Sequence, residues 1–133
     1  DNDRGSISAL MIAGVWIEGQ YFATQVALNN RDEVLRDRIG EQKIILGDLL
    51  MLLRPYSASS GEYQSLFSMI EDISRKYADV RVSYRLGEPE TSEVDGRLIM
   101  VQHEESIVEM SDAQLAEIAE LSKEVRNKLI SGI

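Results

Sequence analysis

The feature that most constrains the fold is a long apolar segment, Ile7–Leu28, in which the only charged residue is Glu18. A helix that is hydrophobic on every side either lies in a protein core or spans a membrane. A spanning helix needs about 20 predominantly apolar residues. Here the second half is polar in places, and the longest clean apolar run, Ala9–Ile17, is much shorter than that. We therefore predict a buried core helix.

The composition indicates one domain that spans residues 1–133 and needs no crosslinks. A chain of 133 residues has the size of a single domain. It contains no cysteine, which excludes disulfides, thiolate metal sites and cysteine nucleophiles. The net charge of −9, without a basic cluster, argues against binding to nucleic acid and to anionic membrane surfaces. Because the sequence starts at Asp1, we expect the C-terminal part of a longer precursor.

Apolar residues at helical spacing predict a helical fold. Asn30, with Glu33 three residues later, is the expected N-cap of the second helix, and Ser111 with Gln114 is that of the last. Pro55 is expected to end the second helix, because the residue before a proline is disfavoured in the α region. The predicted helices are Ser6–Leu28, Arg31–Arg54, Glu62–Ala78 and Asp112–Ser131.

Between the third and fourth helices the pattern changes to that of strands. Apolar and polar residues alternate over Val80–Leu86, which predicts a half-buried strand. Arg97–His103 and Ser106–Met110 are two further predicted strands, and the acidic segment Gly87–Gly96 between them and the first is predicted to be a polar connection. The expected fold class is α+β, mainly α: a four-helix core with a small antiparallel β element.

Glycines inside the first two helices suggest how these helices pack. Each glycine costs roughly 1 kcal/mol relative to alanine in a helix interior, so close contact between backbones is one explanation and helix kinks are the other. Gly40 and Gly47 share one face of the second helix, and Gly19, Ala23 and Ala27 form a stripe of small residues on the first. We expect an antiparallel pair packed along these surfaces, in which Gly47→Leu would be strongly destabilising.

Glu18 heads the candidate site residues. A carboxylate on an apolar helix can form an ion pair, contact a ligand or, with a raised pKa, act as a catalytic acid. A lysine or arginine of the second helix, such as Lys43, is expected to complete a small buried polar network with it. The aromatic residues Trp16, Tyr21 and Phe22 are expected in the core, with a small-molecule pocket that they line as the alternative. The predicted binding residues are Glu18, Trp16, Tyr21, Gln25 and Lys43.

The sequence contains no pattern that identifies a catalytic centre. His103 is the only histidine, which excludes a metal site with several histidines. The acidic residues of Gly87–Gly96 lack the pattern of a calcium loop, and neither a nucleophile elbow nor a phosphate-binding glycine loop occurs. We therefore predict no catalytic residue, no metal site and no cofactor, and an enzyme that uses Glu18 or His103 is a third hypothesis.

Four stretches of the chain carry a resemblance: GVWIEGQYFATQ (Gly14–Gln25), IGEQKIILGDLL (Ile39–Leu50), VRVSYRLGEPE (Val80–Glu90) and IVEMSDAQLAEIAELSKEVRNKLI (Ile107–Ile130). Taken in order, they resemble a group of uncharacterised, mostly helical lipoproteins of the cell envelope of gut-type bacteria. In that group a lipidated cysteine lies near the start of the precursor, well upstream of such a domain. The resemblance implies a periplasmic location and an anchor upstream of Asp1, and it implies no activity or functional residue.

Two functions of different classes follow from these observations. The first is a non-enzymatic binding or scaffolding domain of the bacterial envelope that acts through a protein surface or a modest pocket. The second is a regulatory or adaptor bundle of the cytosol. A protein partner or a second copy of the chain is compatible with these functions, and an edge strand near Val80–Leu86 or leftover apolar surface could pair two copies. Contact with a membrane is expected only through the N-terminal anchor.

Overall fold

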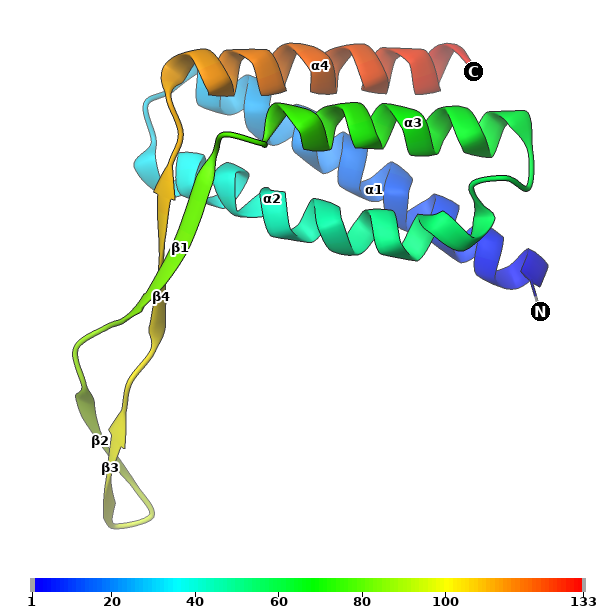
Figure 1. Ribbon diagram of the computed structural model, residues 1–133. Coiled ribbons are helices and arrows are strands. Elements are labelled where there is room, and N and C mark those ends of the chain that lie inside the picture. The colour runs from blue at the N-terminus through cyan, green and yellow to red at the C-terminus, as the bar shows by residue number, and fades with distance from the viewer. Residues whose placement is uncertain (1, 133) are drawn as a thin grey trace.

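The computed structural model describes residues 2–132, with side chains from residue 4 onward. The described part of the chain contains four α-helices, and successive helices run in opposite directions (Figure 1). A short 3-10 turn, Arg54–Tyr56, follows the second helix. The helices are α1 (Asn2–Asn29), α2 (Glu33–Leu53), α3 (Gly61–Lys76) and α4 (Asp112–Ser131).

The helices form a bundle in which α1 and α3 each contact α2 and α4. The centre of the bundle is filled by large aliphatic side chains from α2, α3 and α4, whereas α1 contributes mostly small ones such as Ala9 and Ala13. Small residues let α1 approach its neighbours closely. The largest fully buried side chains include Ile17, Leu46, Leu53, Leu66, Ile70, Ile73, Tyr77 and Ile118.

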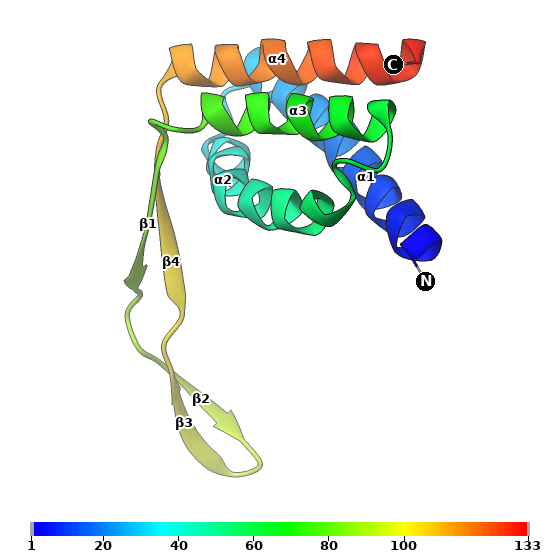
Figure 2. The ribbon, with the colours of Figure 1, turned by 45° about the vertical axis from the view of Figure 1, so that its right-hand side comes forward.

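Between α3 and α4 the chain forms a long hairpin that projects away from the bundle, and we call it the arm (residues 81–109; Figures 1 and 2). Its strands are β1 (Arg81–Leu86), β2 (Glu90–Val94), β3 (Arg97–Val101) and β4 (Glu104–Glu109). β1 pairs with β4 near the bundle and β2 pairs with β3 at the tip, both antiparallel. The predicted antiparallel β element between the last two helices is thereby confirmed.

The tip of the arm differs from the prediction. Glu90–Val94, expected to be part of a polar connection, is the strand β2. Asp95 and Gly96, with φ of 52° and 75°, form the two-residue turn that joins it to β3. Positive φ at both central residues is the geometry of a type I′ hairpin turn, for which Asp-Gly is a preferred sequence.

The sequence predicted that the first helix is buried in the core, but α1 is buried on one face only. One face of α1 packs on the bundle, and the opposite face leaves large apolar side chains exposed: Ile7, Met11, Val15 and Phe22. The physical reason is that the other helices pack against one side of α1 only, so no other part of the described chain covers its outer face. None of the helices in the described part of the chain is long and apolar enough to cross a membrane.

Of the two predicted helix N-caps, one agrees with the structure and one does not. Ser111 caps α4, and it forms the predicted capping box with Gln114. The predicted cap of α2 is wrong: Asp32, not Asn30, accepts a hydrogen bond from the backbone N–H of Leu35. Asn30 instead extends the end of α1, where its side chain donates to the carbonyl of Val26.

The glycines do not mediate tight packing between α1 and α2. Nothing lies within 4 Å of a Cβ added to Gly47 or to Gly19. Gly40 is closely packed, but a Cβ there would overlap the side chain of Val108 in β4. The predicted strong destabilisation by Gly47→Leu is therefore not expected. Gly40, which has no side chain, instead allows Val108 of the arm to pack closely against α2.

Candidate functional site

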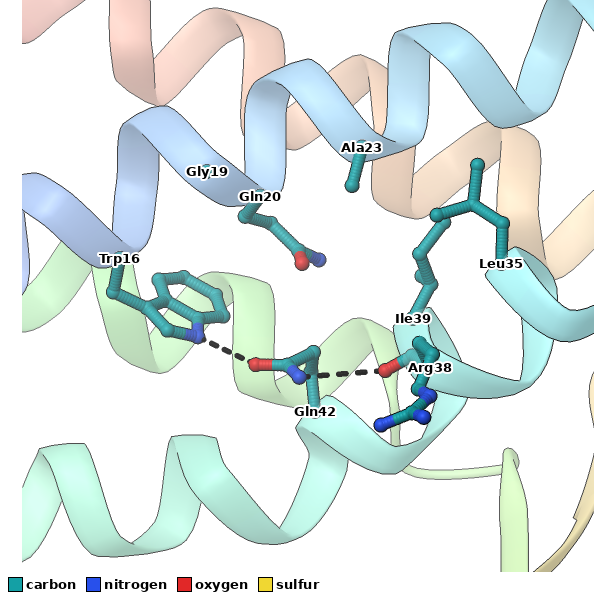
Figure 3. Close-up of a pocket in the computed structure, with 8 residues that line it drawn as sticks. All are labelled: Trp16, Gly19, Gln20, Ala23, Leu35, Arg38, Ile39 and Gln42. Atoms are coloured by element: carbon teal, nitrogen blue, oxygen red, sulfur yellow. Dashed lines mark hydrogen bonds between the residues drawn. The ribbon is translucent and has the colours of Figure 1, made fainter.

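A shallow groove lies on the surface between α1 and α2, with a volume of about 190 Å³ (Figure 3). Trp16 forms one end, and Gly19 leaves space along the wall that α1 contributes. Its opposite wall comes from α2. The lining residues are Trp16, Gly19, Gln20, Ala23, Leu35, Arg38, Ile39 and Gln42.

A buried chain of hydrogen bonds holds the floor of the groove. The amide nitrogen of Gln20 donates to the hydroxyl of Tyr77 at 2.7 Å, and this hydroxyl donates to the carbonyl of Ile39 at 2.8 Å. Burial raises the pKa of the Tyr77 hydroxyl above its ordinary value, and the hydrogen bond from Gln20 offsets only part of that rise. Tyr77 therefore stays neutral, and the network fixes the orientation of the Gln20 amide.

The rim of the groove is polar. The indole nitrogen of Trp16 donates to the side-chain oxygen of Gln42 at 2.8 Å, and the amide nitrogen of Gln42 donates to the carbonyl of Arg38 at 3.3 Å (Figure 3). These bonds hold the indole ring in place. The exposed guanidinium of Arg38 is the only charged group among the residues that line the groove.

Glu18 lies elsewhere, and its predicted pairing is wrong. Its carboxylate accepts hydrogen bonds from Arg126 of α4, at 3.2 Å from Nε and 3.4 Å from Nη2. The same guanidinium stacks over the ring of Tyr21, 4.6 Å from its centroid. Glu18 is exposed, because it faces the outer edge of the α1–α4 interface. The ion pair therefore links two helices at the surface and does not form a buried network with Lys43.

The two remaining predicted residues also lie outside the groove. Lys43 donates to the carbonyl of Val80 at 2.7 Å and to that of Ala78 at 3.3 Å, and it thereby holds the connection from α3 to β1. Gln25 is half-buried on α1, and its carbonyl accepts from Asn29. Of the predicted binding residues, only Trp16 lines the groove.

The arm carries the most exposed apolar strand of the described chain. Leu98 is 78% exposed and Met100 is 73% exposed. They pair with Glu93 and Thr91 of β2 and lie on one face of the hairpin, while Ile99 points to the other face, as expected for alternating strand residues. The strand β3 therefore presents apolar side chains on both of its faces.

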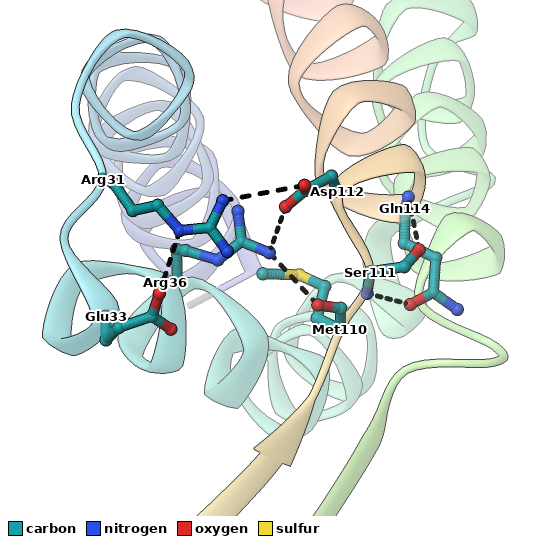
Figure 4. Close-up of polar contacts among 7 residues, drawn as sticks. All are labelled: Arg31, Glu33, Arg36, Met110, Ser111, Asp112 and Gln114. Atoms are coloured by element: carbon teal, nitrogen blue, oxygen red, sulfur yellow. Dashed lines mark hydrogen bonds and ion pairs between the residues drawn. The ribbon is translucent and has the colours of Figure 1, made fainter.

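The root of the arm is fastened to the bundle by polar contacts (Figure 4). Arg36 of α2, whose side chain is only 12% exposed, contacts Asp112 at 2.9 Å and donates to the carbonyl of Met110 at 3.2 Å. Arg31, in the turn between α1 and α2, lies 3.8 Å from the same carboxylate. Together with the Ser111 capping box, these bonds fix the direction in which the chain leaves the arm and enters α4.

The residues considered for catalysis are not brought together. Glu18 lies on α1, whereas His103 lies in the arm, between β3 and β4, where its carbonyl accepts from the backbone N–H of Gly87 at 2.8 Å. Among the described residues, no group of three or more histidine and acidic side chains is placed to hold a metal ion. The acidic segment around Glu90 and Glu93 forms an exposed strand.

Comparison with family models, with curated proteins and with solved structures found no match to this chain.

Proposed function

We propose that this protein is a non-enzymatic binding or scaffolding domain of the bacterial envelope, and that the arm is its contact element for another polypeptide. The observation that carries the proposal is the strand β3, which exposes apolar side chains such as Leu98 and Met100 on a projecting hairpin. Exposed apolar surface of this kind is typical of protein–protein contact sites.

The composition of β3 supports this assignment. A strand with continuous apolar residues on both faces is typical of one that is covered on both sides, yet the arm projects from the bundle and nothing in the described chain covers its tip (Figure 2). An isolated two-stranded hairpin is only marginally stable in water. A partner that covers β3, or pairs with its free edge, would supply the missing contacts.

The contacts between α2 and the part of the arm near the bundle are consistent with a scaffolding role. Val108 packs against Gly40, and Arg36 bonds to the chain at the end of the arm. Ser106 and Glu41 form a further hydrogen bond between the arm and α2. Because several contacts fix the root, a partner bound at the tip would be held in a defined direction relative to the bundle.

The experiment is site-specific photo-crosslinking in the cells that make the protein. A benzophenone amino acid replaces Met100 in one variant of the full-length protein and Met51 in the matched control. Met51 is equally exposed, at 71% against 73%, but lies on α2. Discrete polypeptide adducts from position 100, at least several-fold stronger than from position 51, support the proposal. Absent adducts at position 100, or equal adducts at both positions, contradict it.

The envelope location rests on the resemblance to envelope lipoproteins and has its own test. Cell fractionation with an antibody against the protein would place it in the membrane or periplasmic fraction. Recovery in the cytosolic fraction would overturn the location and favour a cytosolic adaptor, while the crosslinking result would still decide whether the arm contacts a partner.

A further inference from the structure

The groove between α1 and α2 has features that contact of the arm with a protein does not explain. Its volume of about 190 Å³ is comparable to that of an engineered cavity of about 150 Å³ that holds benzene. It is also open to solvent, so a ligand could enter without unfolding of the bundle. The size therefore suits a single ring with a short substituent.

The walls of the groove suit an apolar ring. Ala23, Leu35 and Ile39 supply aliphatic surface, and the indole of Trp16 supplies an aromatic one. A ring beside an indole gains stacking or edge-to-face contact beyond the area that it buries. Because Gly19 carries no side chain and nothing lies within 4 Å of its Cβ position, the space along α1 is left free.

The polar groups at the groove are few: the amide of Gln20 lies at the floor, and the Trp16–Gln42 hydrogen bond and the guanidinium of Arg38 lie at the rim. The side chain of Gln20, which is 4% exposed, lines the groove (Figure 3). Its amide nitrogen donates to the hydroxyl of Tyr77 beneath the groove. Arg38 stands at the rim and makes no ion pair with any described residue. A free cation at the mouth of an apolar groove favours an anionic end on the ligand.

The net charge of −9 does not oppose this choice of ligand. Exposed charges are screened beyond about 8 Å at physiological ionic strength, so the nearest charged group decides the local preference. At this groove the nearest charged group is the guanidinium of Arg38. Planar carboxylates match the paired donors of a guanidinium.

We propose that the groove between α1 and α2 binds a small aryl carboxylate. The ring lies against Trp16 in the space beside Gly19, and the carboxylate pairs with Arg38 at the rim. This site is independent of the proposed contact at the arm, because none of its lining residues belongs to residues 81–109.

The test uses Trp16, the only tryptophan of the chain, as a reporter. The protein is labelled with ¹⁵N and titrated with 3-phenylpropionate while the single indole N–H signal is followed by NMR. We expect a saturable shift with a dissociation constant on the order of 0.1–1 mM, as is usual for a ligand of about eleven heavy atoms. The neutral alcohol 3-phenylpropan-1-ol, which cannot pair with Arg38, should bind about three- to tenfold more weakly.

Two glycine variants form a matched pair. Gly19→Leu places a side chain in the groove, and Gly47→Leu places the same side chain at another open helix position. Nothing lies within 4 Å of a Cβ at either site and both glycines are exposed, so both variants should fold. Gly19→Leu should weaken binding of 3-phenylpropionate at least tenfold, while Gly47→Leu should leave it unchanged. In Arg38→Gln, a change at an exposed residue, the acid should lose its advantage over the alcohol.

The proposal is overturned by any of three results. The first is no saturable shift of the Trp16 signal in the native protein. The second is equal binding by Gly19→Leu and Gly47→Leu, which would place the ligand outside the groove. The third is equal binding of acid and alcohol, which would remove the pairing with Arg38.

Discussion

In the bundle, large apolar side chains such as Leu53 and Ile118 are fully buried, whereas in the arm Leu98 and Met100 are mostly exposed. The two regions contain the same types of residue but use them differently. Burial of apolar surface is the main favourable term in folding, so the bundle contains the residues that stabilise the fold. The apolar residues at the tip of the arm, such as Leu98 and Met100, therefore contribute little to folding and are available for contact with a partner, whereas Val108 near the bundle packs against the core.

The first helix combines both behaviours. Its inner face packs on the bundle through Ala9, Ala13 and Ile17, and its outer face exposes larger residues such as Val15 and Phe22. Exposure of apolar side chains is thus not confined to the arm. What distinguishes the arm is that both faces of one strand are apolar and uncovered.

The largest effect is expected for the difference in unfolding free energy between two leucine-to-alanine variants, one in the bundle and one in the arm. Leu53→Ala removes a fully buried side chain from the bundle and should lower the free energy of unfolding by about 2–5 kcal/mol. Leu98→Ala, in the exposed arm, should change it by no more than about 0.5 kcal/mol. Urea unfolding followed by circular dichroism measures both. Similar losses in the two variants would remove the distinction between bundle and arm.

The next effect concerns the joint between the two regions. Gly40→Ala would make its new Cβ overlap Val108, and the overpacking should cost about 1–3 kcal/mol. Val108→Ala removes the overlapping methyls and leaves its Cβ at 3.4 Å, an ordinary contact. Added to Gly40→Ala, it should therefore restore part of the loss. A double-mutant cycle on unfolding free energies measures this coupling. Strictly additive effects of the two substitutions would contradict the packing of Val108 against Gly40.

A third prediction tests the network beneath the groove through its pH dependence. Burial raises the pKa of Tyr77 above its ordinary value of about 10, so above that pH the folded chain keeps a proton that the unfolded chain releases. Stability should therefore fall as pH rises past about 10, with up to about 1.4 kcal/mol per pH unit from this residue. Tyr77→Phe should be less stable at pH 7, by about 1–3 kcal/mol, because Gln20 and Ile39 lose a partner.

The control for that prediction is the change of the unfolding free energy with pH in the native protein and in Tyr77→Phe. Between pH 10 and 11 the unfolding free energy of Tyr77→Phe should fall less steeply than that of the native protein. Parallel slopes in the two proteins would show that Tyr77 titrates alike in the folded and unfolded chains.

A smaller effect, an increase in stability, is expected at Gly47, which has free space around its Cβ position. Gly47→Ala adds a methyl group where nothing lies within 4 Å, and alanine is the better helix former by about 1 kcal/mol. The midpoint of thermal unfolding should therefore rise by a few degrees. A fall in the midpoint would indicate that the small-residue packing predicted from the sequence exists after all.

Much of the fold was predictable because the information is local. The apolar spacing of the helices, the Ser111–Gln114 capping box and Pro55 after the second helix all act within a few residues. The strand β2 could also have been found, because Asp95-Gly96 is a strong signal for a two-residue hairpin turn. Its acidic and polar composition instead suggested a connecting loop.

The site was less predictable because its geometry depends on contacts distant in sequence. Glu18 pairs with Arg126, a partner 108 residues away, and no spacing pattern distinguishes that partner from Lys43. Gly40 was expected against α1 and lies against Val108. An apolar helix without a polar side also gives no indication of which of its faces is buried, so the exposed face of α1 could not be predicted from its residues.

The most direct test of the central claim is to remove the tip of the arm. A variant in which residues 90–101 are replaced by an Asn-Gly turn lacks β2 and β3 and keeps β1, β4 and the bundle. Its free energy of unfolding should equal that of the native protein within about 0.5 kcal/mol, because the tip buries little apolar surface. A loss of more than about 2 kcal/mol would show that the apolar residues of the tip stabilise the fold and would contradict the account.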